Sequence, residues 1–263
     1  MEFRGNGIEI HYDFSGPEQA DVVTFSHALM ADGRMWEQQL KSLESFRVLR
    51  YDLRGHGQSG CSGVPYDFNL LADDLRALWD HLKIDCTHFV GASLGGMVGL
   101  EIATTTPERI ASLTLCGTRG DGASSNRTDT RDERIEVVQS QGVSALVDSV
   151  LSDWFSDRFR KKSADAVKRA TEMIEGTSVD GVIGCTKAIE TQDHLPLIPT
   201  IKLPCLIAAG EEDLTTPIKE AFDLHVGIDG SDMVVIPKTR HLANVEAADV
   251  FNDVLLTFLK QYS

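Results

Sequence analysis

The 263-residue chain has few of the features that mark secreted, membrane-bound or disulfide-stabilised proteins. Its five cysteines are odd in number and form no C-x-x-C pair, so we expect no disulfide framework and a reducing compartment. No apolar run approaches the length of a membrane span, and the first residues contain no apolar signal segment. The sequence therefore predicts a soluble, cytoplasmic protein.

Positive charge is also scarce, with 25 Lys and Arg residues against 40 Asp and Glu residues and a net charge of −15 at pH 7. Nucleic acids and anionic membranes bind clustered Lys and Arg, so neither is expected as a partner. No group of His, Cys or Asp residues has the spacing of metal ligands, and we expect neither a metal nor another cofactor. The glycine-rich run 52–59 lacks the Lys-Ser/Thr pair of a phosphate-binding loop, so Arg54 and His56 are expected to tie loops together.

What is present is an alternation of strand and helix patterns. Strand patterns occur at 8–12, 22–25, 48–51, 87–90, 112–116, 205–209 and 233–236, and helical patterns separate most of them. This rhythm predicts an α/β fold, a mostly parallel central sheet with helices on both faces.

The rhythm is interrupted between residues 121 and 195, where only helical patterns occur, at 133–141, 143–154, 164–175 and 179–190. A Gly/Ser/Asn/Thr-rich stretch at 120–130 reads as the loop that leads into this segment. We expect a core formed by residues 1–120 and 196–263, and an all-helical cap formed by residues 121–195.

A G-x-S-x-G motif follows the strand at 87–90. Gly91 and Gly95 flank Ser93, and an apolar helical run follows at once. In this context the motif predicts a nucleophile elbow, a sharp strand-to-helix turn that exposes the serine hydroxyl. Glycines are needed on both sides because strand and helix pass close together there. Ser93 is therefore the expected nucleophile.

A serine hydroxyl needs a base, and in this type of fold an acid and then a histidine follow the serine along the chain. Asp213 follows the strand at 205–209, with Glu211 and Glu212 as competing acids and a turn-capping role beside Thr215 as the alternative. His241 follows the strand at 233–236 and precedes a helix, a position that the other histidines downstream of the serine do not share. We expect Asp213 to orient His241, which acts as the base.

The developing oxyanion needs two backbone donors. The N–H of Leu94, directly after the nucleophile, is the first candidate, and the N–H of Leu29, in the loop after the strand at 22–25, is the second. His27 is expected to brace this loop by hydrogen bonds.

With these residues placed, the chain resembles the α/β-hydrolase superfamily over its whole length, and the run 52–59 matches the D-x-R-G-x-G-x-S motif common there. Within the superfamily it resembles the 3-oxoadipate enol-lactonases of bacterial aromatic catabolism, on the segments 34–36, 46–52, 107–110 and 150–155. This resemblance implies the α/β-hydrolase fold, with Ser, Asp and His at 93, 213 and 241.

The predicted activity is that of a cofactor-free serine hydrolase that cleaves a small ester or lactone through an acyl-enzyme, as an enol-lactonase does. A general carboxylesterase and an acyl-homoserine-lactone lactonase are alternatives, and a non-catalytic ligand receptor is a third. The partner is a small-molecule substrate, and the sequence leaves room for a homo-oligomer.

Trp154, in the helical segment, is the expected substrate-binding residue, with a core role as the alternative. Relatives of this kind often carry Arg before this Trp, whereas this chain has Asp153. Asp153 is expected to repel a substrate carboxylate.

Overall fold

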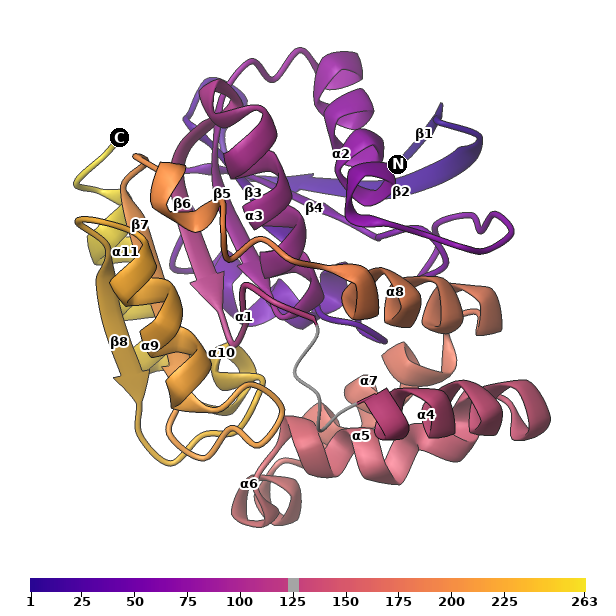
Figure 1. The fold of residues 1–263 in the computed structure, drawn as a ribbon. Helices are drawn as coiled ribbons and strands as arrows, with labels where there is room; N and C mark the ends of the chain where they lie inside the picture. The colour runs from indigo at the N-terminus through magenta and orange to yellow at the C-terminus, as the bar shows by residue number, and fades with distance from the viewer. Residues whose placement is uncertain (123–127) are drawn as a thin grey trace.

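An eight-stranded sheet runs through the middle of the molecule in the computed structural model, which describes residues 1–122 and 128–263 (Figure 1). The strand order is β1-β2-β4-β3-β5-β6-β7-β8. β2 pairs antiparallel with β1 and β4, and every other pair is parallel. The predicted fold class is therefore confirmed.

The strands agree closely with the sequence patterns, except at the N-terminal edge. Sequence patterns predicted all of them but β1, a four-residue edge strand with no buried residue and hence no apolar signal. The strands are β1 (Glu2–Gly5), β2 (Ile8–Ser15), β3 (Val22–Ser26), β4 (Arg47–Tyr51), β5 (Thr87–Ala92), β6 (Ile110–Cys116), β7 (Cys205–Gly210) and β8 (Asp232–Ile236).

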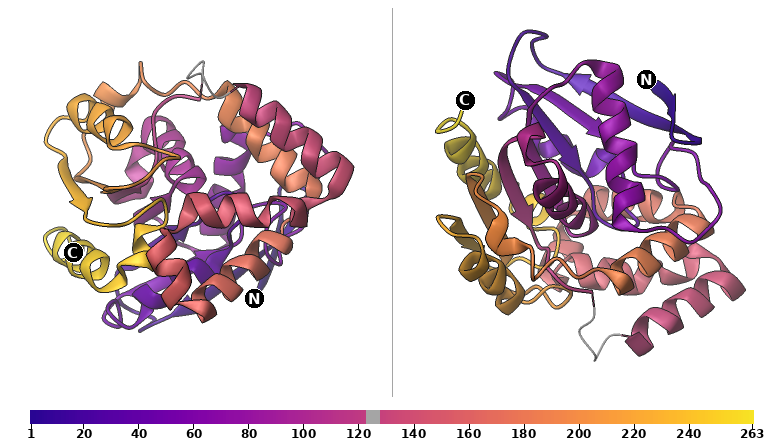
Figure 2. Two further views of the ribbon diagram at one scale, coloured as in Figure 1. Left: turned by 90° about the horizontal axis from the view of Figure 1, so that it is seen from below. Right: turned by 45° about the horizontal axis from the view of Figure 1, so that its top comes forward.

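Helices cover both faces of the sheet (Figure 2). One face carries α2 (Phe68–Leu82), α3 (Leu94–Thr105) and α9 (Ile218–Gly227), and the other carries η1 (Gly33–Trp36), α1 (Glu37–Leu40), α10 (Ala243–Glu246) and α11 (Ala248–Leu259). In α2 the fully buried Leu71, Leu75 and Leu78 form one stripe, as expected for a helix packed on a sheet. α3 is buried along most of its length because it packs against the sheet and α2.

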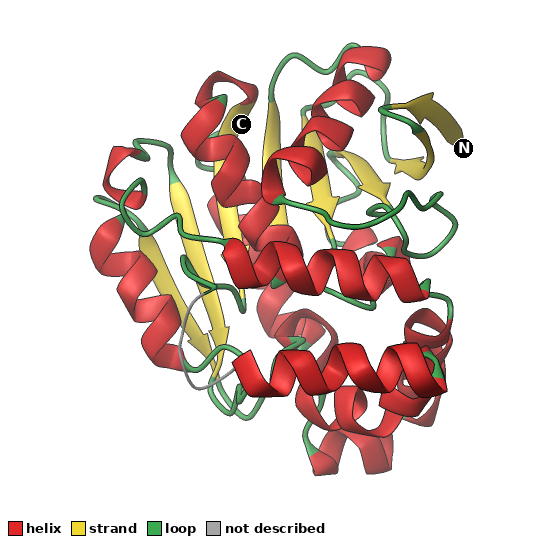
Figure 3. Cartoon of the chain, turned by 45° about the vertical axis from the view of Figure 1, so that its right-hand side comes forward, coloured by secondary structure: helices red, strands yellow, loops and turns green. Residues whose placement is uncertain are grey.

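The described part of the segment between β6 and β7 contains helices, loops and one isolated bridge between Asp121 and Asp193. Its helices lie beyond the carboxyl ends of the strands (Figures 1 and 3). We call its elements from α4 to α8 the helical insertion. They are α4 (Thr128–Gln141), η3 (Val143–Leu146), α5 (Val147–Trp154), α6 (Asp157–Lys162), α7 (Ala164–Glu175) and α8 (Val179–Thr191), and the short turns η2 (Pro107–Arg109) and η4 (Ile198–Thr200) lie in the remainder of the chain.

Two predictions for the insertion need comment. The predicted loop at 120–130 falls partly outside the described residues, which exclude 123–127, and α4 already begins at Thr128. The helix α6 was missed because its six residues are mostly charged and give no apolar period. Within the described residues, no helix is both long enough and apolar enough to cross a membrane.

The insertion is joined to the rest of the chain through backbone contacts. The Ser178 N–H, at the start of α8, donates to the Gly55 carbonyl at 2.8 Å, and a Cβ on Gly181 would lie 2.4 Å from the same oxygen. At the end of α5, the Trp154 carbonyl accepts from the Leu242 N–H at 3.2 Å. These contacts fix the insertion over the ends of the strands.

The loop 52–59 is held by a buried ion pair. Arg54 Nε lies 2.6 Å from an oxygen of Asp74 on α2, and both side chains are almost fully buried. Arg54 also donates to Ser62 Oγ at 2.6 Å, and Asn6 donates to Asp74 at 2.7 Å. Arg54 thus ties loops together, as the sequence predicted.

Asp74→Asn should destabilise the fold strongly, because it leaves the guanidinium of Arg54 buried without a counter-charge. We expect a loss of about 3–5 kcal/mol in the free energy of unfolding, measured in urea. Asp73→Asn is the matched control, since Asp73 is half exposed and pairs with Arg76 on the surface. Its effect should stay below about 1 kcal/mol. Equal losses in the two variants would contradict the role given to the buried pair.

Candidate active site

The turn between β5 and α3 has the geometry that the G-x-S-x-G motif predicted. Ser93 has φ 52° and ψ −114°, a left-handed conformation that is strained for a residue with a side chain. A Cβ on Gly91 would lie 2.4 Å from the Gly95 carbonyl oxygen, and one on Gly95 would lie 2.3 Å from that of Ser26. Only glycine fits at these two positions, because helix and strand nearly touch there.

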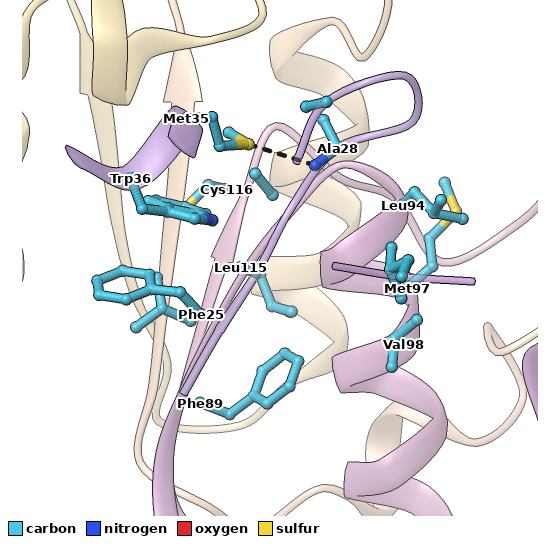
Figure 4. Close-up of a cluster of buried hydrophobic side chains, with 14 of the residues drawn as sticks. Phe25, Ala28, Met35, Trp36, Phe89, Leu94, Met97, Val98, Leu115 and Cys116 are labelled. Carbon is cyan, nitrogen blue, oxygen red and sulfur yellow. Dashed lines mark hydrogen bonds between the residues drawn. The ribbon is translucent and has the colours of Figure 1, made fainter. Parts of the chain in front are cut away.

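Packed side chains support this turn from below (Figure 4). Phe25 of β3, Phe89 of β5, Leu115 of β6 and Val98 of α3 are fully buried. The backbone is also tied to its neighbour strand, since the Ser93 N–H donates to the Cys116 carbonyl at 2.8 Å. The position of Ser93 is therefore set by the rigid centre of the sheet.

Asp213 and His241 meet at the ends of β7 and β8. His241 Nδ1 lies 2.8 Å from Asp213 Oδ2, and both residues are buried. Because an ionised carboxylate only accepts hydrogen bonds, Nδ1 carries the proton and Nε2 keeps its lone pair. The ring is thus held in the tautomer that can accept a proton at Nε2.

The Asp213 carboxylate has further donors. Oδ1 accepts from the N–H groups of Thr215 at 2.7 Å and Thr216 at 2.9 Å, and Oδ2 accepts from Thr216 Oγ1 at 2.7 Å. Burial raises the pKa of Asp213, but the His241 charge and these hydrogen bonds outweigh it and hold the pKa below its usual value. Asp213 therefore both caps the turn and orients His241, and the two readings that the sequence left open are compatible.

The competing acids and histidines lie elsewhere. Glu211 accepts from the Lys238 N–H at 2.8 Å, and Glu212 pairs with Arg158 at 3.0 Å. His225 lies within α9, and His194 pairs with Glu101 at 2.6 Å. These groups do not line the cavity that holds Ser93 and His241.

That cavity has a volume of about 100 Å³ and lies between the sheet and the helical insertion. A cavity needs about 10–15 Å³ to hold one water molecule, so this cavity has room for several water-sized groups. Ser93, His241, Leu29 and Trp154 all line it, as do Met97, Val150 and Ile189. A larger open hollow, near α7 and α11, contains none of the predicted site residues.

Leu29 lines the same cavity as Ser93, and Leu94 directly follows Ser93 in the chain. Within the described residues, no hydrogen bond uses the N–H of Leu29 or of Leu94. Leu94 is the first residue of α3, where N–H groups have no partner inside the helix. Leu29 precedes Met30, which has φ 61°, in a turn closed by the Ala31 N–H and the Ala28 carbonyl at 3.0 Å.

His27 braces this loop, as predicted. Its Nε2 accepts from the Leu53 N–H at 2.8 Å, so Nδ1 carries the proton and donates to the Ala28 carbonyl at 2.8 Å. The ring lies 5.2 Å from that of His56. Burial lowers the pKa of His27 to about 4 and that of His56 to about 3, so both rings are neutral at pH 7.

Sequence reasoning missed a group of arginines. Arg119, Arg131 and Arg134 line the cavity, and Asp153 is the one carboxylate among the described lining residues. Arg119 lies 3.7 Å from Glu220. Arg131, Arg134 and the buried Val138 recur at i, i+3 and i+7 and so share one face of α4. An arginine pair at the start of a buried stripe was the signal that could have revealed them.

Asp153 lies in the cavity wall with Arg134 near it. Burial raises the pKa of Asp153, while the charges of Arg134 and His241 act to lower it. Burial lowers the pKa of the Arg134 guanidinium, and Asp153 acts to raise it. The cavity therefore contains a cation close to the carboxylate, which the sequence did not indicate.

No set of three or more His, Cys, Asp or Glu side chains in the described parts of the chain is arranged to hold a metal ion. The reactive groups in the cavity are a hydroxyl, an imidazole and a carboxylate behind it. This set of groups can perform nucleophilic acyl transfer.

Known proteins resemble the chain over nearly its full length. A family model described as the alpha/beta hydrolase fold matches residues 21–248. Two 3-oxoadipate enol-lactonases of Acinetobacter baylyi are 31% and 28% identical to the chain, over 97% of it and 94% and 95% of their own lengths. The crystal structure of the enol-lactonase from Burkholderia xenovorans LB400 superimposes with a TM-score of 0.95 at 31% identity, covering 99% of this chain and 100% of that one.

His27 and His56 should make the protein lose stability in mild acid. Both are neutral in the native state and bind a proton on unfolding below about pH 6.5, so stability is retained above that pH and falls below it. At pH 5 each should cost about 2 kcal/mol of the free energy of unfolding, measured in urea. His56→Asn should reduce this loss by about 2 kcal/mol relative to the native chain. An unchanged pH dependence in that variant would contradict the assignment.

Proposed function

The chain belongs to the α/β-hydrolase fold family, and from this premise we propose that it hydrolyses a small lactone or ester through an acyl-enzyme formed on Ser93. One observation carries the proposal. Ser93 and His241 line one cavity, and His241 is oriented by Asp213 at 2.8 Å, although the three residues are far apart in the sequence. The two enol-lactonase relatives and the enol-lactonase structure support the substrate class.

In the first half-reaction, His241 Nε2 takes the proton of Ser93 Oγ while Oγ bonds to the substrate carbonyl carbon. The carbonyl electrons move onto its oxygen. When they return, the bond to the ring or ester oxygen breaks, and that oxygen takes the proton from His241. In the second half-reaction water repeats the attack with His241 as base. The products are the acid and free Ser93.

Backbone donors stabilise the oxyanion in both half-reactions. The N–H groups of Leu29 and Leu94 are suited to this role because no described hydrogen bond occupies them. Each such donor typically contributes about 3–4 kcal/mol of transition-state stabilisation. The hydrogen bonds of His27 keep the Leu29 loop in place.

The helical insertion forms the roof of the cavity, through Arg134, Val150, Trp154 and Ile189. We therefore propose the division expected from the sequence, with residues 1–120 and 196–263 as the catalytic core and 121–195 as its cap. The cap excludes water and selects the substrate. Trp154 is buried and lines the cavity, so it contributes both to packing and to substrate contact.

The charges of the cavity favour a lactone or ester that carries a carboxylate. Arg134 lies near Asp153 and offsets its charge. A guanidinium binds a carboxylate through charge-assisted hydrogen bonds. The repulsion expected from Asp153 is thus reduced, and an enol-lactone with a carboxylate is a substrate that this site can hold.

Ser93→Ala should abolish turnover while ligand binding persists. We expect kcat for a lactone and for p-nitrophenyl esters to fall by about a thousandfold or more, because the acyl-enzyme cannot form. Ser149→Ala on the exposed side of α5 is the control and should keep full activity. Binding of a lactone without turnover in the native chain, or undiminished turnover in Ser93→Ala, would favour a receptor over an enzyme.

The charge balance of the cavity can be tested with a carboxylate-bearing ester and its methyl ester. Arg134→Gln should lower the kcat/KM ratio of acid to methyl ester by about tenfold or more, and Asp153→Asn should raise it by about threefold or more. Arg160→Gln removes the same charge from α6, outside the cavity, and should leave the ratio unchanged. If neither cavity variant alters the ratio, these side chains do not face the substrate.

A further inference from the structure

One threonine of the helical insertion lines the cavity but has no part in the chemistry proposed above. Thr186 lies on α8 and is 1% exposed. It shares the cavity with Ser93 and His241. Ile189, three residues further along α8, lines the same cavity. The cavity face of α8 therefore combines one hydroxyl with an apolar side chain.

The hydroxyl oxygen of Thr186 is buried and has no hydrogen-bond partner within the described part of the chain. Threonines in helices commonly donate to the carbonyl one turn earlier. Among the helical residues whose side chains are described, five other threonines do so at 2.6–3.3 Å, namely Thr104, Thr105, Thr171, Thr191 and Thr257. An unmade hydrogen bond at a buried hydroxyl lowers stability, so its retention in a cavity wall calls for an explanation.

The backbone around Thr186 is held firmly. A Cβ on Gly184 would lie 2.3 Å from the ring of Tyr66, and a Cβ on Gly181 would lie 2.4 Å from the Gly55 carbonyl oxygen. Just beyond α8, His194 bonds to Gln192 at 2.8 Å and to Glu101 of α3 at 2.6 Å. α3 begins at the nucleophile turn, so the hydroxyl of Thr186 is held at a fixed position relative to Ser93.

The residues around Thr186 indicate which kind of group its hydroxyl would bind. α4, which carries Arg134, packs against α8, which carries Thr186. Arg134 and Thr186 both line the cavity. A hydroxyl near a guanidinium is best satisfied by an acceptor oxygen, because one such oxygen can accept from both groups. A plain alkyl chain offers no such atom and leaves the hydroxyl unpaired.

We propose that Thr186 is a specificity-determining residue whose hydroxyl donates a hydrogen bond to a carbonyl or carboxylate oxygen on the acyl part of the substrate, away from the reacting carbonyl. The proposal rests on the hydrolase function above and names its substrate class as oxo- or carboxy-acyl lactones and esters. Ser93 performs the reaction, and Thr186 sets which acyl chain reaches it.

The test uses neutral esters of equal length, so that the arginines have no charge to attract. p-Nitrophenyl 4-oxopentanoate and 5-oxohexanoate are compared with the pentanoate and the hexanoate. The native chain should prefer at least one oxo ester over its alkyl counterpart by about tenfold in kcat/KM. Thr186→Val should lower that preference by about fivefold or more, chiefly through KM, and should leave alkyl esters unchanged or improved.

Two matched variants separate recognition from structure. Thr186→Ser keeps the hydroxyl and should keep the preference. Thr114 on β6 is also fully buried with an unpartnered hydroxyl among the described residues, but it does not line the cavity. Thr114→Val should therefore change only the unfolding temperature.

Failure of this proposal differs from failure of the hydrolase function. If the native chain cleaves the esters but shows no preference for an oxo group, or if Thr186→Val slows oxo and alkyl esters equally, the role of Thr186 is overturned. The first of these outcomes can be observed even if Thr186→Val does not fold, because it needs only the native chain. If the native chain cleaves none of the esters or lactones, it is the proposed function that fails.

Discussion

The close approach of α3 to β3 and β5 is the constraint on which the site depends. With glycine at 91 and 95, the helix starts directly against the sheet, and the chain can turn only by placing Ser93 in a left-handed conformation. Because β3 and β5 are neighbours, the same contact brings the Leu29 loop beside the N-terminus of α3. The proposed nucleophile and the proposed oxyanion donors are thus positioned by the same backbone packing.

The sequence indicated those candidate site residues that follow strands of the sheet. Ser93, Asp213 and His241 each follow a strand, and the carboxyl ends of parallel strands meet at one edge, so alternation and chain order were enough to bring them together. Thr186 and Arg134 were not predicted, because they lie on helices whose position relative to the sheet is set by tertiary contacts. Periodicity gives the buried face of a helix and leaves open what that face meets. The strand β1 and the helix α6 were missed since short, polar elements carry little apolar pattern.

The distribution of charge is as informative as its sum. The chain carries an excess of acidic residues, yet its small cavity gathers arginines from α4 and from the segment after β6. Potential inside a narrow, poorly hydrated space is set by the nearest groups, because distant surface charges are screened by solvent. Net charge therefore does not indicate the kind of small molecule that this cavity accepts.

The backbone contact between Gly55 and the start of α8 limits how the helical insertion can be exchanged between related enzymes. Backbone meets backbone there, with Gly181 against the Gly55 carbonyl and Ser178 bonded to it. A helical insertion taken from another hydrolase would need glycine at position 181. With any other residue there, it would be displaced from the nucleophile. New substrate specificity is therefore easier to obtain by changing side chains within the helical insertion than by replacing the whole insertion.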